Sequence, residues 1–161
     1  MVNFLEVEKS LTENQILAFE QSVNFRLPKE YSEHLLKFNG GRCEPNVCYF
    51  YQRNWLGFRR LDATDVRYFF AIYDGEFDNL ALKFEVYKIQ VKRLQERILP
   101  FAGDSMGNLF CISCRGIDEG YIYFWDHERE VKHKSGNDDD DFRNLNIVAK
   151  SFNEFLLNLK S

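Results

Sequence analysis

The chain has 161 residues, of which 45% are apolar and 16% aromatic, a length and composition that predict one domain with one core, over residues 1–161. Its formal net charge is −4 and it has no Lys/Arg block, which argues against direct binding to nucleic acid and favours a basic partner. Acids in the first eight residues, and apolar runs shorter than the roughly 18 residues of a membrane span, predict a cytoplasmic protein without membrane contact.

Two helices are predicted in the first quarter of the chain. The stretch Thr12–Gln15 fits a capping box, and the apolar spacing after it predicts a helix over about 13–23. A second helix is predicted to begin at Leu27-Pro28-Lys29-Glu30-Tyr31, with Pro28 at its first position. The sequence Asn39-Gly40-Gly41 predicts the end of this helix.

The middle of the chain is less regular. Val47–Tyr51 and Tyr68–Tyr73 are rich in β-forming residues and predict strands, whereas 52–66 shows no clear pattern. Residues 78–96 have helical spacing, although their β-branched residues leave a strand open for the first half. We predict a middle helix there.

The last third of the chain predicts an antiparallel meander. Three apolar runs, 98–101, 109–114 and 121–125, are separated by glycine-containing turns. A short strand follows at 146–150, and Ser151–Glu154 is a second capping box that opens a terminal helix. The predicted fold class is therefore α+β, with a mostly antiparallel or mixed sheet, N-terminal helices, one middle helix and a C-terminal helix.

The four cysteines permit two interpretations. The spacing of Cys111 and Cys114 is that of some zinc and redox sites, but both residues lie on a predicted strand, where positions three apart point to opposite faces. We therefore prefer to interpret them, with Cys43 and Cys48, as small buried apolar side chains, and expect no metal or cofactor.

Several short motifs follow one another in a characteristic order. They are Leu27-Pro28-Lys29-Glu30-Tyr31, Phe38-Asn39-Gly40-Gly41, Leu99-Pro100-Phe101-Ala102, Gly107-Asn108-Leu109, Trp125-Asp126-His127-Glu128 and a Ser-Phe-x-Glu-Phe-Leu segment over 151–156. In this order they resemble the SUKH superfamily, whose founding fungal members are the Smi/Knr regulators of cell-wall assembly. The resemblance covers about residues 12–157, with an unmatched middle from 41 to about 97. Asn108 is a departure, because the family often has Asp there.

The resemblance implies an α+β domain without known catalysis. Bacterial members serve chiefly as immunity partners of secreted polymorphic toxins, which are often nucleases. The implied partner is therefore a cognate toxin, with a basic nuclease domain as one option. Fungal relatives are regulatory interaction proteins, so a non-catalytic scaffold is the alternative. The oligomeric state is left open.

A serine hydrolase is a further alternative. Gly103-Asp104-Ser105-Met106-Gly107 formally matches a nucleophile elbow, and Asp126 with His127 or His133 follows in the order that a hydrolase uses. The elbow requires a helix after the turn, whereas 108–114 has strand composition. We therefore expect a hairpin loop here and no catalytic residue.

Other polar residues have both a chemical and a structural interpretation. Asp126-His127-Glu128 could bind a metal, but adjacent residues at a strand end point apart. The acidic run at 135–141 is expected to be a mobile, solvated loop or a contact for a basic toxin, and it lacks the spacing of a calcium loop. His34 is expected at the surface or at its boundary.

The candidate partner contacts comprise aromatic anchors and acids. They are Tyr49, Tyr51 and Trp55, with core packing equally open for the first two, and the acids Asp104, Asp126, Glu128, Asp138, Asp139, Asp140 and Asp141. A second set, Leu27, Pro28, Tyr31, Asn39, Gly40, Gly41, Pro100, Gly107 and Trp125, is assigned to the architecture.

Overall fold

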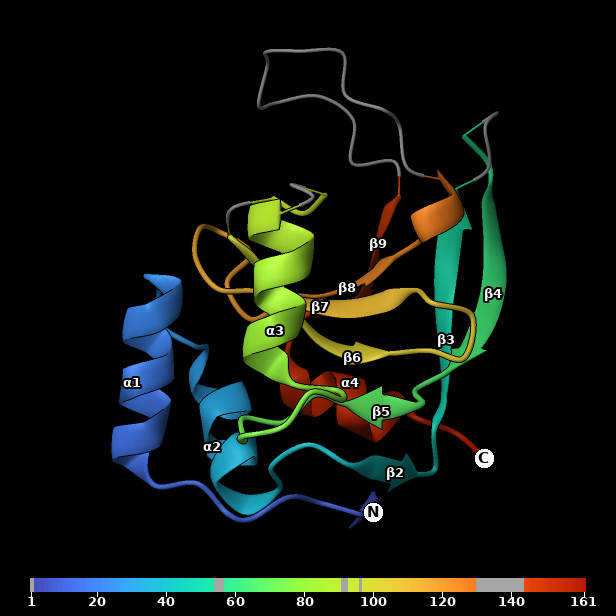
Figure 1. Ribbon diagram of the computed structural model, residues 1–161. Coiled ribbons are helices and arrows are strands. Elements are labelled where there is room, and N and C mark those ends of the chain that lie inside the picture. Colours follow the sequence, from blue (N-terminus) through green and yellow to red (C-terminus); the bar gives the residue numbers. More distant parts are fainter. Residues whose placement is uncertain (1, 54–56, 91–92, 96, 130–143) are drawn as a thin grey trace.

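A five-stranded antiparallel sheet lies at the centre of the fold (Figure 1). The computed structural model describes residues 2–53, 57–90, 93–95, 97–129 and 144–161. The sheet contains, side by side in chain order, β5 (Tyr68–Phe69), β6 (Ile98–Gly103), β7 (Leu109–Ser113), β8 (Ile122–Trp125) and β9 (Leu145–Ala149). The predicted meander is confirmed, and the predicted strand at Tyr68–Tyr73 is shorter than expected.

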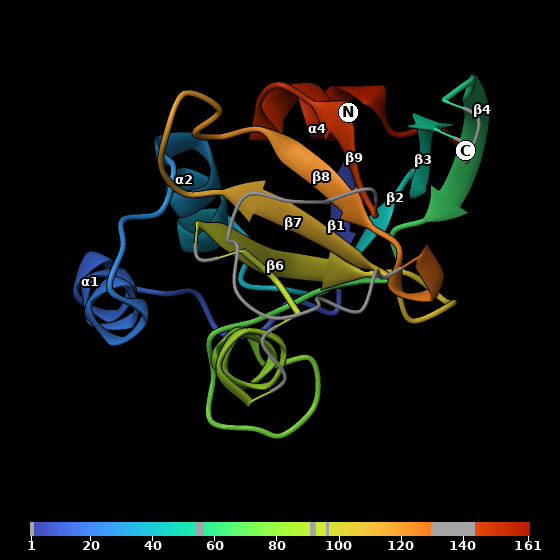
Figure 2. The same ribbon diagram turned by 90° about the horizontal axis from the view of Figure 1, so that it is seen from above.

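Helices cover both faces of this sheet, which is why β6 and β7 are almost continuously apolar (Figure 2). On one face lies α4 (Phe152–Asn158), whose N-cap Ser151 accepts a hydrogen bond from the Glu154 amide, as the capping box predicts. Phe155 of α4 lies 5.5 Å from Phe101 and 5.4 Å from Phe110, measured between ring centroids. These aromatic contacts form the centre of the core.

On the other face lies α3 (Leu80–Phe84), which continues as a π-helix, η1 (Glu85–Gln90). Tyr87 of η1 packs edge-on against Trp125 with ring centroids 5.7 Å apart. The predicted helix over 78–96 is therefore confirmed in position but too long, because residues 93–95 are not helical. The amide of Arg93 donates to the Tyr87 carbonyl over 2.9 Å, six residues back, so Arg93 lies beside the end of η1.

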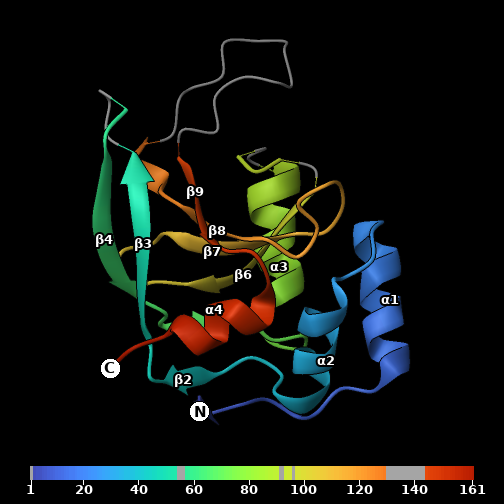
Figure 3. The same ribbon diagram turned by 180° about the vertical axis from the view of Figure 1, so that it is seen from behind.

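The two N-terminal helices lie beside each other at one end of the sheet (Figures 1 and 3). The first, α1 (Glu13–Val23), has the predicted capping box between Thr12 and Gln15. The second, α2 (Lys29–Lys37), begins one residue later than predicted, since Pro28 is its N-cap and not its first helical residue.

The Asn39-Gly40-Gly41 sequence joins α2 to β2 (Arg42–Glu44), which pairs with β1 (Asn3–Leu5). Gly40 and Gly41 have φ angles of 71° and 93°, in the left-handed region. A Cβ atom on Gly41 would lie 2.4 Å from the Leu5 carbonyl oxygen, so the close passage of the chain also requires glycine.

Asn39 itself is buried and holds two other segments by its side-chain amide. Its Nδ2 donates to the carbonyls of Lys9 and Ile72, each over 2.9 Å, and its Oδ1 accepts from the Ile72 amide over 2.9 Å. Asn39 therefore links the chain before α1 to the chain after β5.

His34 corrects the expectation of a surface or boundary histidine. It is only 7% exposed, and its ring lies 4.7 Å from that of Phe4 and 4.8 Å from that of Phe152, between centroids. Burial, together with the nearby positive charge of Lys37, lowers its pKa from 6.5 to about 4. The imidazole is therefore neutral in the core near neutral pH.

The region 52–66, for which the sequence predicted no structure, contains β4 (Arg59–Asp65), the second strand of a long hairpin. β4 pairs with β3 (Val47–Arg53), and the hairpin stands at the side of the domain with β4 outermost (Figures 1 and 3). A short 3₁₀ helix, η2 (His127–Arg129), follows β8 next to this hairpin. No helix among the described residues is both long and apolar enough to cross a membrane.

Candidate partner-binding surface

The β3–β4 hairpin has one buried and one exposed face. Along β3, Cys48, Phe50 and Gln52 are buried, while the alternating Tyr49 and Tyr51 are 49% and 54% exposed. Phe50 packs on Phe124 of the central sheet with ring centroids 4.5 Å apart. The period of two along the strand thus directs both tyrosines to solvent.

Residues of β4 enlarge this exposed face. The register places Leu61 opposite Tyr51 and Ala63 opposite Tyr49, and Leu61 is 54% exposed. The guanidinium of Arg59 lies 5.3 Å from the centroid of the Tyr51 ring, a cation–π contact. We call Tyr49, Tyr51, Arg59, Leu61 and Ala63 the hairpin face. Tyrosine and arginine are the residue types that most often dominate binding energy at interfaces.

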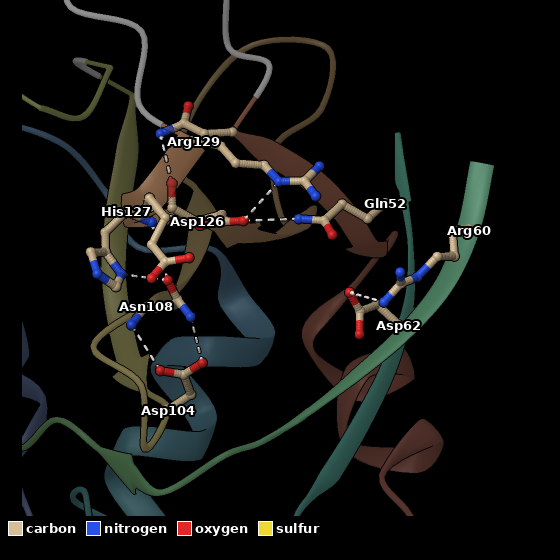
Figure 4. Close-up of polar contacts among 10 residues, drawn as sticks. Gln52, Arg60, Asp62, Asp104, Asn108, Asp126, His127 and Arg129 are labelled. Carbon is tan, nitrogen blue, oxygen red and sulfur yellow. Dashed lines mark hydrogen bonds and ion pairs between the residues drawn. The ribbon is translucent and has the colours of Figure 1, made fainter. Parts of the chain in front are cut away.

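Polar side chains hold the inner face of the hairpin to the rest of the domain (Figure 4). The Gln52 amide donates to Asp126 Oδ2 over 2.9 Å, at the end of β8. The Thr64 hydroxyl donates to Asp104 Oδ2 over 2.9 Å, in the β6–β7 turn. The hairpin is therefore fixed on both strands, so the hairpin face is held in place before any partner binds.

Asp104 is 7% exposed and serves the β6–β7 turn. Its Oδ1 accepts from the amides of Met106 and Asn108 over 2.9 and 2.8 Å, and its Oδ2 accepts from the Asn108 side chain over 2.8 Å. With Thr64 as a further donor, the carboxylate is occupied within the chain. Its position favours an architectural role over the partner contact that we expected.

Asn108 acts as both donor and acceptor in this network (Figure 4). While its amide nitrogen donates to Asp104, its Oδ1 accepts from the backbone amide of His127 over 3.1 Å and lies 2.7 Å from His127 Nδ1. An aspartate here would lack the donor and would place a second carboxylate beside Asp104. Asn108, which stands where the family often has Asp, therefore supplies both the donor and the acceptor that its neighbours require.

Asp126 and Glu128 lie near the hairpin but differ in exposure. The Asp126 side chain is 14% exposed, bonds to Gln52 and forms an ion pair with Arg129 over 3.3 Å. Glu128 is exposed on η2, and its amide donates to Asp126 Oδ1 over 3.0 Å. Of the two, Glu128 is the acid with access to a partner.

The nucleophile-elbow match at Ser105 lies in a hairpin turn between β6 and β7, where an elbow would require a helix to follow. The Ser105 hydroxyl donates to Asp65 of β4, and His127 is engaged with Asn108. Within the part of the chain that the structure describes, no three His, Cys, Asp or Glu side chains converge as metal ligands.

All four cysteines are free and buried, which confirms their interpretation as apolar side chains. Burial raises the pKa of Cys43 and Cys48 to about 12 and also raises that of Cys111 and Cys114. None of them is an activated thiolate.

The residues assigned to the architecture occupy the core or turns. Leu27, Tyr31 and Trp125 are buried, and Pro100 lies at a β-bulge in β6, where a strand tolerates proline. Gly107 closes the β6–β7 turn with a φ of 91°. Trp55, Asp138, Asp139, Asp140, Asp141 and the loop 135–141 lie outside the described residues.

Sequence reasoning missed Arg59 and Leu61. The sequence of β4, Arg-Arg-Leu-Asp-Ala-Thr-Asp, contains few β-forming residues, and the only signal is the alternation of Leu61 and Ala63 with polar residues. Their place opposite the two tyrosines follows from pairing with β3.

Comparison with known proteins assigns the fold. A model of the SMI1/KNR4 family (SUKH-1) matches residues 10–158. The chain belongs to this family. It is also 29% identical over 159 residues to the SPbeta prophage-derived uncharacterized protein YokK of Bacillus subtilis (strain 168), an alignment covering 92% of this chain and 74% of that protein. The family match includes the hairpin, so β3 and β4 are part of the SUKH domain in this chain.

Proposed function

We propose that the chain is an immunity protein that binds a cognate toxin domain through the hairpin face and neutralises it by covering the toxin's active site. Members of the SUKH family are commonly immunity proteins. The observation that carries the proposal is the hairpin face itself, which exposes two tyrosines and a leucine side by side on one strand pair. Exposed aromatic groups on a fixed strand pair lose little entropy on binding.

The proposed mechanism is steric and electrostatic, not catalytic. Tyr49, Tyr51 and Leu61 supply the apolar centre, and Arg59 supplies a donor already ordered against Tyr51. Glu128 lies on the adjacent 3₁₀ helix, and with the acids at 138–141 we assign it to contacts with a basic toxin. The net charge of −4 would accelerate association with such a toxin at low salt. The chain would act in the cytoplasm, before the toxin reaches its target.

The proposal is tested by capture and rescue. Tagged protein retains its partner from the native host, mass spectrometry identifies it, and the captured toxin domain is then expressed with or without this chain. Growth should be restored by the wild-type protein, and the double change Tyr51→Ala with Leu61→Ser should abolish rescue and weaken binding at least about 100-fold, as loss of two anchors does. Phe77, 81% exposed outside the hairpin, supplies the control Phe77→Ala, which should rescue normally.

Two outcomes would replace the proposal. Retention of housekeeping proteins alone, with no toxin, would indicate the regulatory scaffold known from fungal relatives. Ester hydrolysis by the purified protein that Ser105→Ala abolishes would indicate an enzyme. Rescue by the Tyr51/Leu61 double variant would keep the immunity role but remove the hairpin face from the interface.

A further inference from the structure

The outer edge of β4 is not paired with any strand in the part of the chain that the structure describes. Among the described residues, β4 pairs only with β3, in an unbroken register from Val47–Asp65 to Arg53–Arg59. It has seven residues and contains neither proline nor a bulge, two of the devices that blunt an edge, and its charges include both signs. No other described element lies beyond β4 in any of the three ribbon views (Figures 1, 2 and 3).

The register decides which backbone groups this edge presents. The Val66 amide donates to the Asn46 carbonyl over 2.7 Å, so these two residues form a hydrogen-bonded pair. Because such pairs alternate along an antiparallel ladder, every second residue pair from there is also hydrogen-bonded between β3 and β4. The intervening residues, Arg59, Leu61 and Ala63, therefore direct their backbone amides and carbonyls away from β3. In agreement with this, the Ala63 amide donates to the side chain of Asp62 and not to β3.

The charges on this edge are arranged symmetrically about Leu61. Arg60 precedes it and Asp62 follows it, on the same face of the strand, with their charged atoms 3.8 Å apart (Figure 4). The Arg60 side chain is 79% exposed and that of Asp62 is 34% exposed. Neither charge is buried by the domain to which it belongs.

We propose that β4 pairs antiparallel with β4 of a second copy of this chain, with the two-fold axis at Leu61. In this register Leu61 faces Leu61 of the second copy, and Arg59 faces Ala63, so the outward backbone groups of both strands meet. Arg60 of each copy lies opposite Asp62 of the other, so the two-fold axis generates two favourable cross-strand pairs. A register centred on Asp62 would instead place the two aspartates opposite each other and is disfavoured.

Pairing exchanges existing contacts and does not uncover new polar groups. On pairing, the Ala63 amide donates to the Arg59 carbonyl of the second copy instead of to the Asp62 carboxylate. That carboxylate can then form an ion pair with Arg60 of the second copy. The two hairpins become one four-stranded sheet, β3-β4-β4-β3, and their hairpin faces lie side by side on its outer surface. The dimer does not require that the hairpin face bind a toxin, so it stands apart from the proposed function.

A charge-reversal cycle in sedimentation equilibrium tests the dimer. A contact of two short strands is small, so the wild-type chain should dissociate in the range of about 10 to 500 µM. Arg60→Asp and Asp62→Arg each set like charges opposite one another and should weaken the dimer about tenfold or more. The double variant restores opposite charges and should recover the wild-type affinity. Reversal of the exposed Lys29–Glu33 pair on α2, Lys29→Glu with Glu33→Lys, is the control and should change nothing.

Cross-linking tests the register. A short bismaleimide should join two copies of Leu61→Cys, whereas Ala63→Cys should remain unlinked, because the two Ala63 positions would lie about 13 Å apart along the strands. The native cysteines are buried, and circular dichroism verifies the fold of each variant. A wild-type chain that is monomeric throughout this range, a double variant that stays monomeric while folded, or equal cross-linking at positions 61 and 63 would each overturn the proposal.

Discussion

The side-chain amide of Gln52 donates to the carboxylate of Asp126 over 2.9 Å, and this bond joins the inner face of β3 to the end of β8. Gln52 is 7% exposed and lies directly after the exposed Tyr51. Gln52 thus fixes the strand, while the preceding residue, Tyr51, exposes its aromatic ring to solvent. The rigidity of the hairpin face depends on this pair.

Replacing Gln52 by alanine should loosen the hairpin while leaving the fold intact. We expect the free energy of unfolding to fall by about 1 kcal/mol, the usual value of a partly buried hydrogen bond. Amide hydrogen exchange should accelerate in 47–53 and 59–65. The control Leu157→Ala, on α4 and outside the hairpin, should leave both quantities nearly unchanged, since Leu157 is 78% exposed. Unaltered exchange in Gln52→Ala would mean that the packing of Phe50 and the Thr64–Asp104 hydrogen bond are enough to fix the hairpin.

Asn39→Ala should be strongly destabilising. It removes the hydrogen bonds to Lys9 and Ile72 and leaves the partly buried backbone groups of Ile72 without these partners. We expect a loss of about 2–4 kcal/mol in urea denaturation, because each unsatisfied buried group carries its desolvation cost. The exposed Asn153→Ala provides the matched control and should change stability by less than about 0.5 kcal/mol. A small effect at Asn39 would show that water replaces its side chain.

His34 should make the fold sensitive to acid. Its pKa is about 4 in the folded chain against 6.5 as the ordinary value, so between these pH values the unfolded chain binds more protons. Stability should therefore fall as the pH decreases from 6.5 to 4, by about 3 kcal/mol in full. Above pH 6.5 the titration of His34 should add no pH dependence.

The pH dependence is measured by urea denaturation at several pH values between 7 and 4. His34→Leu removes the titrating group, so its stability should decline less over this range than that of the wild type. Identical declines for the two proteins would assign the acid sensitivity to other groups.

The native thiols should react slowly with a disulfide reagent. Burial raises the pKa of Cys43 and Cys48 to about 12, and all four sulfur atoms are covered, so thiolate is scarce and access is blocked. At pH 8, labelling of the folded protein should be limited by opening of the structure, and in denaturing urea all four cysteines should react quickly. A single fast-reacting cysteine in the folded protein would contradict this arrangement.

The sequence predicted most elements because their signals are local. Capping residues such as Thr12 and Ser151 set the helix starts, and the alternation of apolar runs with glycine turns identified β6, β7 and β8. The middle helix was predicted too long, because helical spacing continues in the sequence past Gln90, whereas residues 93–95 are not helical in the structure. His34 was misplaced because a single polar residue does not reveal which side of its helix is covered.

The sequence by itself determined the α+β class, the order of the elements and the resemblance to the SUKH family, since capping, periodicity and motif order are properties of neighbouring residues. Only the tertiary structure decided that Tyr49 and Tyr51 face solvent and that Leu61 and Arg59 join them, because the exposed side of a strand depends on what packs against the other side. The tertiary structure also decided that Asp104 bonds to Thr64 and that no described strand pairs with the outer edge of β4, since burial and pairing are set by residues distant in the chain.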